Sequence, residues 1–184
     1  MPKAFVELGG RPMVEWSERA LRTAGIPFVR VVPAGHEGVP GGATRSASVR
    51  NGLAALQSCD VVIVHDAARP LVAPELFRRC VEALADWDGV VAAARVTDTI
   101  RSEDGGTLDR SKLWAVQTPQ AFRRAWLERA LAVPDALLAA ATDDASLVEA
   151  AGGRVGIVEA PASNFKVTTP HDLAVAEWLL SHSC

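Results

Sequence analysis

The sequence predicts an α/β fold of the doubly wound kind, with a mostly parallel sheet and helices on both of its faces. Short runs rich in Val, Ile and Ala alternate along the chain with amphipathic segments, the order expected of βαβ units. The runs are near-continuously apolar, which is typical of parallel strands that are covered on both sides. We therefore expect one domain over residues 1–184, without repeats or linkers.

Each element follows from a local pattern. Strands are expected where the apolar runs occur, at Pro27–Pro33, Asp60–His65, Gly89–Val96 and Arg154–Glu159. Helices are expected where apolar residues recur at 3- and 4-residue spacing, at Met13–Ala24, Ser46–Leu56, Pro74–Ala85, Gln120–Leu131, Asp144–Ala150 and Pro170–Leu180. Pro74 suits a first helical turn. Thr142 or Asp143 is the expected N-cap of the fifth helix, and Thr169 that of the sixth.

One segment interrupts this alternation. Residues Thr97–Thr118 contain the turn signal Asp104-Gly105-Gly106, with Ile100 before it and Leu108 after it. The segment is predicted to form a long hairpin that projects from the domain. Because such an arm often embraces a second subunit, we expect a homodimer.

Composition and charge exclude several classes of protein. The formal net charge is −3, which is too slight and too acidic for a chain that binds nucleic acid through its overall field. No apolar run approaches the roughly 20 residues that cross a bilayer, and Met1–Phe5 has no signal-peptide pattern. Cys59, Cys80 and Cys184 suit neither a disulfide framework nor a zinc site. We expect a cytoplasmic protein with reduced thiols and no membrane partner.

The first candidate site follows the strand at Asp60–His65. Ligands collect at the carboxyl ends of strands in such sheets, and Asp66 stands at such an end. Asp66 could bind a divalent metal or a substrate hydroxyl, and Arg69 could meet a phosphate or anchor the loop. The alternative is that Asp66 only accepts hydrogen bonds from loop amides and pairs with Arg69.

The second candidate site is Gly41–Val49, where two glycines enter a helix. Free amides at a helix N-terminus suit an anion or the edge of a nucleobase. A glycine pair before a helix is weak support on its own, because it is more often just a turn and a cap.

The third candidate site is Asn164–Pro170, which leads into the last helix. Lys166 beside a helix N-terminus makes a plausible phosphate site. The sequence has only three lysines, Lys3, Lys112 and Lys166, among 19 basic residues. This scarcity favours functional positions for the lysines that remain.

Other candidates are weaker. Asp143 and Asp144 are interpreted as an anionic helix start rather than as metal ligands. The histidines have no clustered partners, so no zinc site is predicted. No Ser/His/Asp or Cys/His arrangement is recognisable. The chain has no tyrosine and few aromatic residues, which argues against a stacking platform for single-stranded nucleic acid.

In order along the chain, these clusters resemble one family, the methylerythritol-phosphate cytidylyltransferases. The similar segments are Pro2-Lys3-x-Phe5 with Leu8-x-Gly10-x-Pro12, Gly41-Gly42-Ala43-Thr44-Arg45-x-x-Ser48-Val49, His65-Asp66-Ala67-Ala68-Arg69-Pro70, Asp98-Thr99, Asp109-Arg110-x-x-Leu113-Trp114, Gln117-Thr118-Pro119-Gln120, Thr142-Asp143-Asp144-Ala145, and Asn164-x-Lys166-Val167-Thr168. The resemblance covers the whole chain and implies a Rossmann-like nucleotidyltransferase fold. It also implies transfer of a cytidylyl group from CTP to 2-C-methyl-D-erythritol 4-phosphate in isoprenoid precursor synthesis.

The resemblance also implies a role for each matched residue. Lys3 and Lys166 would be catalytic and stabilise the charge that grows on the α-phosphate, while Mg²⁺ bridges the triphosphate and Asp66 is its candidate ligand. The expected contacts to the nucleotide come from Gly42, Ala43, Ser48 and Ala67. The expected contacts to the sugar-alcohol phosphate come from Asp66, Arg69, Thr99, Arg110 and Thr118. Thr99 and Arg110 would belong to the arm of a second subunit.

The sequence also departs from the family pattern. In the family, a strand and a glycine-rich loop with an arginine precede Pro2-Lys3, so we expect that this sequence is part of a longer protein; otherwise the polypeptide is inactive. Ala4 and Ala47 replace the usual Gln and Asp. Two other functions stay open. One is a sibling enzyme that acts on ribitol phosphate or a related alcohol phosphate. The other is a non-catalytic nucleotide-binding relative, which the retained lysines oppose.

Overall fold

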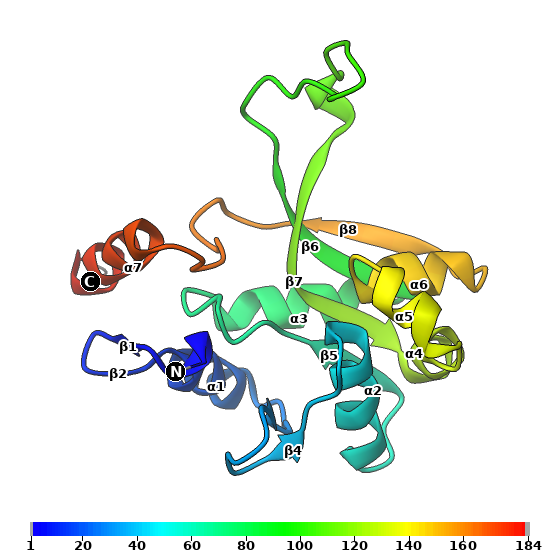
Figure 1. Cartoon of the computed structure of the whole chain (residues 1–184), viewed down its shortest axis with the longest axis horizontal. Helices are drawn as coiled ribbons and strands as arrows, with labels where there is room; N and C mark the ends of the chain where they lie inside the picture. Colours follow the sequence, from blue (N-terminus) through cyan, green and yellow to red (C-terminus); the bar gives the residue numbers. More distant parts are fainter. Residues whose placement is uncertain (1, 183–184) are drawn as a thin grey trace.

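Four strands form the central sheet, in the order β5-β7-β6-β8, in a computed structural model that describes residues 2–182 (Figure 1). The strands are β5 (Val61–Val64), β6 (Gly89–Arg95), β7 (Trp114–Arg123) and β8 (Val155–Glu159). β6 and β8 are parallel, whereas β7 is antiparallel to both of its neighbours. Three of the four strands therefore run in the same direction.

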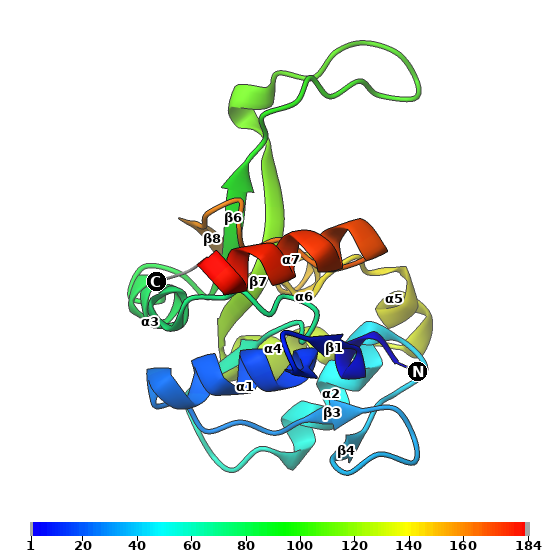
Figure 2. The ribbon, with the colours of Figure 1, turned by 90° about the vertical axis from the view of Figure 1, so that its left-hand side faces the viewer.

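Helices cover both faces of this sheet, which confirms the doubly wound α/β prediction (Figures 1 and 2). One face packs against α1 (Met13–Ala24) and α3 (Pro74–Ala83). The other face packs against α2 (Arg45–Ala55), α4 (Arg124–Leu131), α5 (Asp135–Ala140) and α6 (Asp144–Ala150). Side chains of β5 alternate between the two cores, with Ile63 in the first and Val62 in the second. No helix in residues 2–182 is long and apolar enough to cross a membrane.

The two ends of the chain pack together in a third core. The 3₁₀ helix η1 (Lys3–Phe5) leads into a hairpin of β1 (Glu7–Leu8) and β2 (Arg11–Pro12). Leu8 of this hairpin is buried with Val167 and with Ala176 of α7 (Pro170–His182). This packing brings η1 close to the segment that precedes α7.

The predicted strand at Pro27–Pro33 is largely wrong. Only β3 (Val31–Val32) is a strand, and it pairs with β4 (Val39–Pro40) in a separate two-stranded parallel sheet. The backbone of this segment bonds to the residues that follow it, since Val39 N–H donates to Arg30 O at 2.8 Å. A cavity of about 700 Å³ separates the segment from β5.

The predicted helix at Gln120–Leu131 begins too early. The helix starts at Arg124, and residues 120–123 are the last part of β7. This stretch is hydrogen-bonded to β5 on one side and β6 on the other, and Gln117–Phe122 is buried. Pairing on both edges of a central strand overrides the helical spacing of its apolar residues.

The arm at residues 97–118 is a hairpin, as predicted, and it projects away from the domain (Figures 1 and 2). Its base is the ladder between β6 and β7, and its tip is closed by the pair Arg101–Thr107. Gly105 and Gly106 have φ angles of 101° and 82°, a region that favours glycine. The short 3₁₀ helix η2 (Arg110–Lys112) lies on the returning side.

The remaining helix predictions agree closely with the structure. The bounds of α1 and α6 are as predicted, and those of α2, α3 and α7 differ by one or two residues at an end. α5 was not predicted. Asp143 caps α6 by accepting from Ser146 N–H at 2.9 Å. Thr169 caps α7 by accepting from Asp172 N–H at 3.1 Å, while the Asp172 carboxylate accepts in return from Thr169 N–H.

Candidate active site

An ion pair between Lys166 and Asp66 lies at the centre of the site. Asp66 follows the end of β5, and Lys166 lies on the segment between β8 and α7. Lys166 Nζ donates to Asp66 Oδ2 at 2.8 Å. Burial opposes ionisation of Asp66, but the hydrogen bond and charge of Lys166 outweigh it, together with the nearby charges of Arg45 and Arg69. The pKa of Asp66 is therefore below its ordinary value.

β7 holds the backbone next to this pair. Val64 lies opposite Gln120 in the β5–β7 ladder, so Asp66 comes close to Thr118. Asp66 N–H donates to Thr118 Oγ1 at 2.9 Å, and His65 Nδ1 lies 3.1 Å from the same hydroxyl. Burial lowers the pKa of His65 to about 4, so its imidazole is neutral at pH 7. Thr118 is itself buried, and any contact with a substrate stays a prediction.

Arg69 anchors the loop after β5. Its Nη1 donates to the backbone oxygen of Asn164 at 2.8 Å, and its own N–H donates to Asp66 O at 2.9 Å. These bonds correspond to the anchoring role, one of the two alternatives that the sequence left open. Contact between Arg69 and a phosphate stays a prediction.

The glycine loop is built closely onto the start of α2. Gly42 N–H donates to Ser48 Oγ at 3.0 Å, and Ser48 Oγ donates to Thr44 O at 2.9 Å. A Cβ on Gly42 would lie only 2.6 Å from Ala47 Cβ, so a side chain does not fit here. The loop thus holds Gly42, Ala43 and the Ser48 hydroxyl beside a helix N-terminus.

The two loops line one cavity of about 700 Å³. Its polar wall includes Gly42 and Ser48 from the second candidate site and Asp66 and Ala67 from the first. Its other walls are mostly apolar and come from α1, β5 and the segment around β3. A concave, largely apolar space with a few convergent polar groups has the character and size of a small-molecule site.

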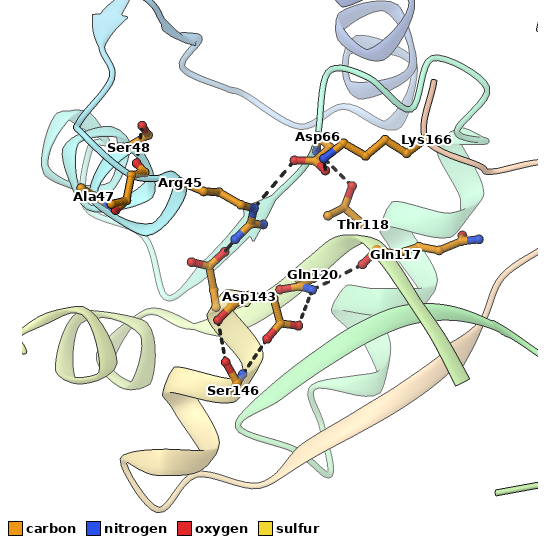
Figure 3. A network of polar contacts seen from close by, with 12 residues as sticks. Arg45, Ala47, Ser48, Asp66, Gln117, Thr118, Gln120, Asp143, Ser146 and Lys166 are labelled. Atoms are coloured by element: carbon orange, nitrogen blue, oxygen red, sulfur yellow. Dashed lines mark hydrogen bonds and ion pairs between the residues drawn. The ribbon is translucent and has the colours of Figure 1, made fainter. Parts of the chain in front are cut away.

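An ion pair that was not predicted connects α2 to α6. Arg45 Nη1 donates to Asp144 Oδ2 at 2.7 Å. Arg45 Nε also lies 3.9 Å from Asp66 Oδ1 (Figure 3). Burial raises the pKa of Asp144, although the charge of Arg45 opposes the rise. Asp143 caps α6 as predicted and also accepts from Gln120 Nε2 at 3.1 Å. Arg45 and Asp144 both stand in motif segments, but 99 residues separate them, so spacing could not pair them.

Lys3 reaches the same segment as Lys166. Its Nζ donates to Thr168 O at 3.1 Å, two residues after Lys166. Thr99 and Arg110 belong instead to the arm at residues 97–118, which projects away from the domain (Figure 2). Arg110 Nη1 donates there to Thr97 O, within the arm. The structure thus unites the predicted residues of the domain and leaves the two arm residues apart.

Asp66 supplies the candidate protein ligand for a metal ion at this site. No group of three or more His, Cys, Asp or Glu side chains in residues 2–182 could bind a metal. The oxygen Asp66 Oδ1 carries no hydrogen bond from another described residue and faces Arg45 Nε at 3.9 Å. Mg²⁺ is commonly bound by one or two carboxylates together with substrate phosphates and water. The donor set at Asp66 fits that arrangement.

The doubly wound fold and the cavity at the carboxyl end of β5 define the class of Rossmann-like α/β proteins that bind a ligand at this edge of the sheet. Comparison with known proteins narrows this class. The family model described as 2-C-methyl-D-erythritol 4-phosphate cytidylyltransferase matches residues 1–182. The chain belongs to this family of nucleotidyltransferases, which confirms the resemblance found in the sequence.

Individual relatives agree with the family match. Proteins named 2-C-methyl-D-erythritol 4-phosphate cytidylyltransferase from Deinococcus radiodurans and Rubrobacter xylanophilus are 44% and 42% identical over 98% of this chain, covering 83% and 88% of those proteins. A bifunctional enzyme IspD/IspF of Anaeromyxobacter sp. is 41% identical over 97% of this chain, which spans 53% of that longer protein. The crystal structure of the cytidylyltransferase from Thermus thermophilus superposes with a TM-score of 0.88 at 39% identity, covering 98% of this chain and 94% of that one.

Proposed function

We propose that this protein transfers a cytidylyl group from CTP to 2-C-methyl-D-erythritol 4-phosphate in isoprenoid precursor synthesis. A phosphate oxygen of the acceptor attacks the α-phosphorus of CTP and forms the new P–O bond. The bond from that phosphorus to the oxygen that bridges to the β-phosphate breaks, and pyrophosphate leaves with its electron pair. The family match and the names of the relatives support this reaction.

The observation that carries the proposal is the Lys166–Asp66 pair beside the glycine-lined cavity. The nucleoside would occupy the cavity, with its base at Gly42, Ala43 and Ser48 and its ribose near Ala67. The α-phosphate would then lie toward Lys166. Positioning and charge neutralisation carry most of the catalysis in phosphoryl transfer reactions, because the protein itself forms no covalent bond.

Two lysines would neutralise the reacting phosphate. Lys166 is bound to Asp66 in the free protein, and Lys3 is bound to the backbone of Thr168. Lys166 therefore belongs to the segment before α7, and the Lys3 ammonium contacts that same segment. Positive groups that are already in place can stabilise the charge of the transition state with little reorganisation.

Mg²⁺ is the proposed metal, with Asp66 as its protein ligand. When bound, it would neutralise part of the charge on the triphosphate and orient the pyrophosphate as a leaving group. The other substrate, the sugar-alcohol phosphate, would contact Asp66, Arg69 and Thr118 near the mouth of the cavity.

The arm supports a homodimer as part of the proposal. Thr99 and Arg110 are exposed residues of the arm, which projects away from the domain. In a symmetric dimer, these residues of a second copy would complete the binding site for the sugar-alcohol phosphate. We also propose a cytoplasmic location, which suits the free thiols of Cys59 and Cys80. Cys184 lies outside the described residues.

The test is pyrophosphate release by the full-length protein with CTP, Mg²⁺ and 2-C-methyl-D-erythritol 4-phosphate. Product identity is checked by mass spectrometry, and ribitol 5-phosphate is run in parallel. Release with the methylerythritol phosphate and loss of release with EDTA are expected. A strong preference for ribitol phosphate would replace the acceptor, and CTP binding without pyrophosphate release in the presence of either acceptor would favour a non-catalytic protein.

A further inference from the structure

Asn164 is a buried amide just before Lys166 that joins two parts of the site. Its side chain is almost completely buried, with a relative exposure of 1%. Its Nδ2 donates to Gln117 Oε1 at 2.8 Å and to Thr118 O at 2.9 Å. Both N–H bonds of the amide are therefore used to bind β7.

The backbone around Asn164 is fixed to the loop after β5 as well. The carbonyl oxygen of Asn164 accepts from Arg69 Nη1 at 2.8 Å. On the other side of Lys166, Val167 N–H donates to Ala68 O at 2.8 Å. The segment from Asn164 to Val167, which includes Lys166, is thus held at both ends, next to the loop that carries Asp66.

Fixing this backbone determines where the Lys166 ammonium can lie. The side chain of Lys166 is 43% exposed, and a long flexible side chain gains little order from one exposed ion pair. Its reach to Asp66 Oδ2 depends on where its Cα is held. We propose that Asn164 is a positioning residue for Lys166, which it orients through β7 without touching the substrate. This inference rests on the proposed function for its catalytic consequence.

The substitution Asn164→Asp separates this role from simple packing. Aspartate has nearly the same shape, but it presents oxygens to Gln117 Oε1 and Thr118 O, both of which are acceptors. The bond to the fixed backbone oxygen of Thr118 is replaced by repulsion, and a bond to Gln117 can form again only if its side-chain amide turns over. A misplacement of about 1 Å can lower the rate of a positioned reaction by about 100-fold, so we expect a fall in kcat of that order. The KM for CTP should change by less than about 3-fold, because no bond joins Asn164 to Gly42 or Ser48.

A double-mutant cycle with Lys166→Ala tests whether Asn164 acts through Lys166. In the Lys166→Ala background, Asn164→Asp should alter the residual kcat by less than about 2-fold, because the group that it positions is already missing. An equal loss of kcat in both backgrounds would indicate a general structural role and would overturn the proposal. Gln117→Met removes one of the two hydrogen bonds from the other side and provides a second variant if Asn164→Asp does not fold.

A second measurement reads the position of Lys166 without catalysis. The chain has only three lysines, so ¹³C-methylation of their amines gives few NMR signals, which single Lys→Arg variants assign. The Lys166 signal should move toward that of the exposed Lys112 in Asn164→Asp and, by less, in Gln117→Met. The control is Asn51→Asp, which replaces the only other asparagine of the sequence. Asn51 Nδ2 donates to Pro40 O at 3.0 Å, so this variant also loses a hydrogen bond, but the Lys166 signal should stay in place.

The two measurements keep the proposals distinguishable. If the wild-type protein releases no pyrophosphate, the proposed function fails, and the Lys166 signal alone decides the role of Asn164. If the wild-type protein is active and the signal stays in its wild-type position in both variants, Asn164 does not position Lys166.

Discussion

Lys166 Nζ and Asp66 Oδ2 lie 2.8 Å apart and join two segments that are 100 residues apart in the sequence. The other oxygen of Asp66 faces Arg45 Nε at 3.9 Å. Asp66 thus stands between two cations from different elements, and its carboxylate balances the charge of Lys166. A bound triphosphate would compete with Asp66 for hydrogen bonds from Lys166. The ion pair therefore holds the ammonium group beside the position where the phosphate would bind.

Replacing Lys166 by Ala should remove most turnover and spare the fold. Loss of one charged donor to a reacting phosphate costs about 100- to 1,000-fold in kcat. The side chain is 43% exposed, so its removal leaves no cavity in the core. The measurement is steady-state pyrophosphate release beside a thermal unfolding curve. The control is Lys112→Ala, whose side chain is 82% exposed on the arm and should be neutral. Near-normal turnover of Lys166→Ala would remove the lysine from the mechanism.

Arg45 and Asp144 form an ion pair in which only the aspartate is fully buried, so the free energy of unfolding should fall by different amounts when each partner is replaced. Arg45→Met leaves the Asp144 carboxylate, whose side chain is fully buried, without a cation, and should lower the free energy of unfolding by about 3 kcal/mol. Asp144→Asn should cost less, because the guanidinium that remains is 34% exposed and can reach water or Asp66. Urea unfolding measures both.

The control for this comparison is an exposed ion pair that joins α2 to α5. Arg50 and Asp135 lie 2.8 Å apart and are 41% and 84% exposed. Asp135→Asn should therefore change the free energy of unfolding by less than about 1 kcal/mol. Equal effects of Arg45→Met and Asp144→Asn would contradict the argument from unequal burial.

Local patterns in the sequence predicted most of the helices, although not α5 or the start of α4, because the signals for a helix lie within a few residues. Apolar spacing gave α1 and α6 with their observed bounds, and Thr169 caps α7 as expected. β7 was missed as a central strand because Gln117, Thr118 and Gln120 interrupt its apolar run. Those polar residues are buried only because partners from distant segments satisfy them, and local periodicity does not contain that information.

The same limit applies to the site. Asp66 and Lys166 were candidates from their positions at a strand end and before a helix, and resemblance to a family added Lys3 and gave all three a predicted role. The resemblance gave no role to Arg45 or Asn164, although both stand in matched segments too. Their contacts join residues that lie 99 and about 47 positions apart, so only the folded chain brings them together.

The stability of the protein should fall at alkaline pH because of Cys80. Burial raises the pKa of this thiol to about 12, from about 9 when it is exposed. Between these values the unfolded chain has released the proton and the folded chain still holds it, so the free energy of unfolding falls as pH rises. The slope is at most about 1.4 kcal/mol per pH unit. The chain has no tyrosine to add to this slope. Urea unfolding from pH 8 to 10.5 measures it, and Cys80→Ala should flatten it; an unchanged slope in that variant would be contrary to this assignment.

Two inactive variants should restore activity when they are mixed, if the arm completes the site of a second copy. Lys166→Ala damages the site on the domain, and Arg110→Ala damages the arm that would reach the other subunit. In a mixed dimer of two-fold symmetry, one site receives both defects and the other receives neither. Random exchange makes half of the dimers mixed, so about a quarter of the wild-type activity should return. The measurement is pyrophosphate release after the two variants are mixed and allowed to exchange subunits, with sedimentation to record the dimer. If exchange occurs and no activity returns, or if the wild-type protein sediments as a fully active monomer, Arg110 does not act across subunits.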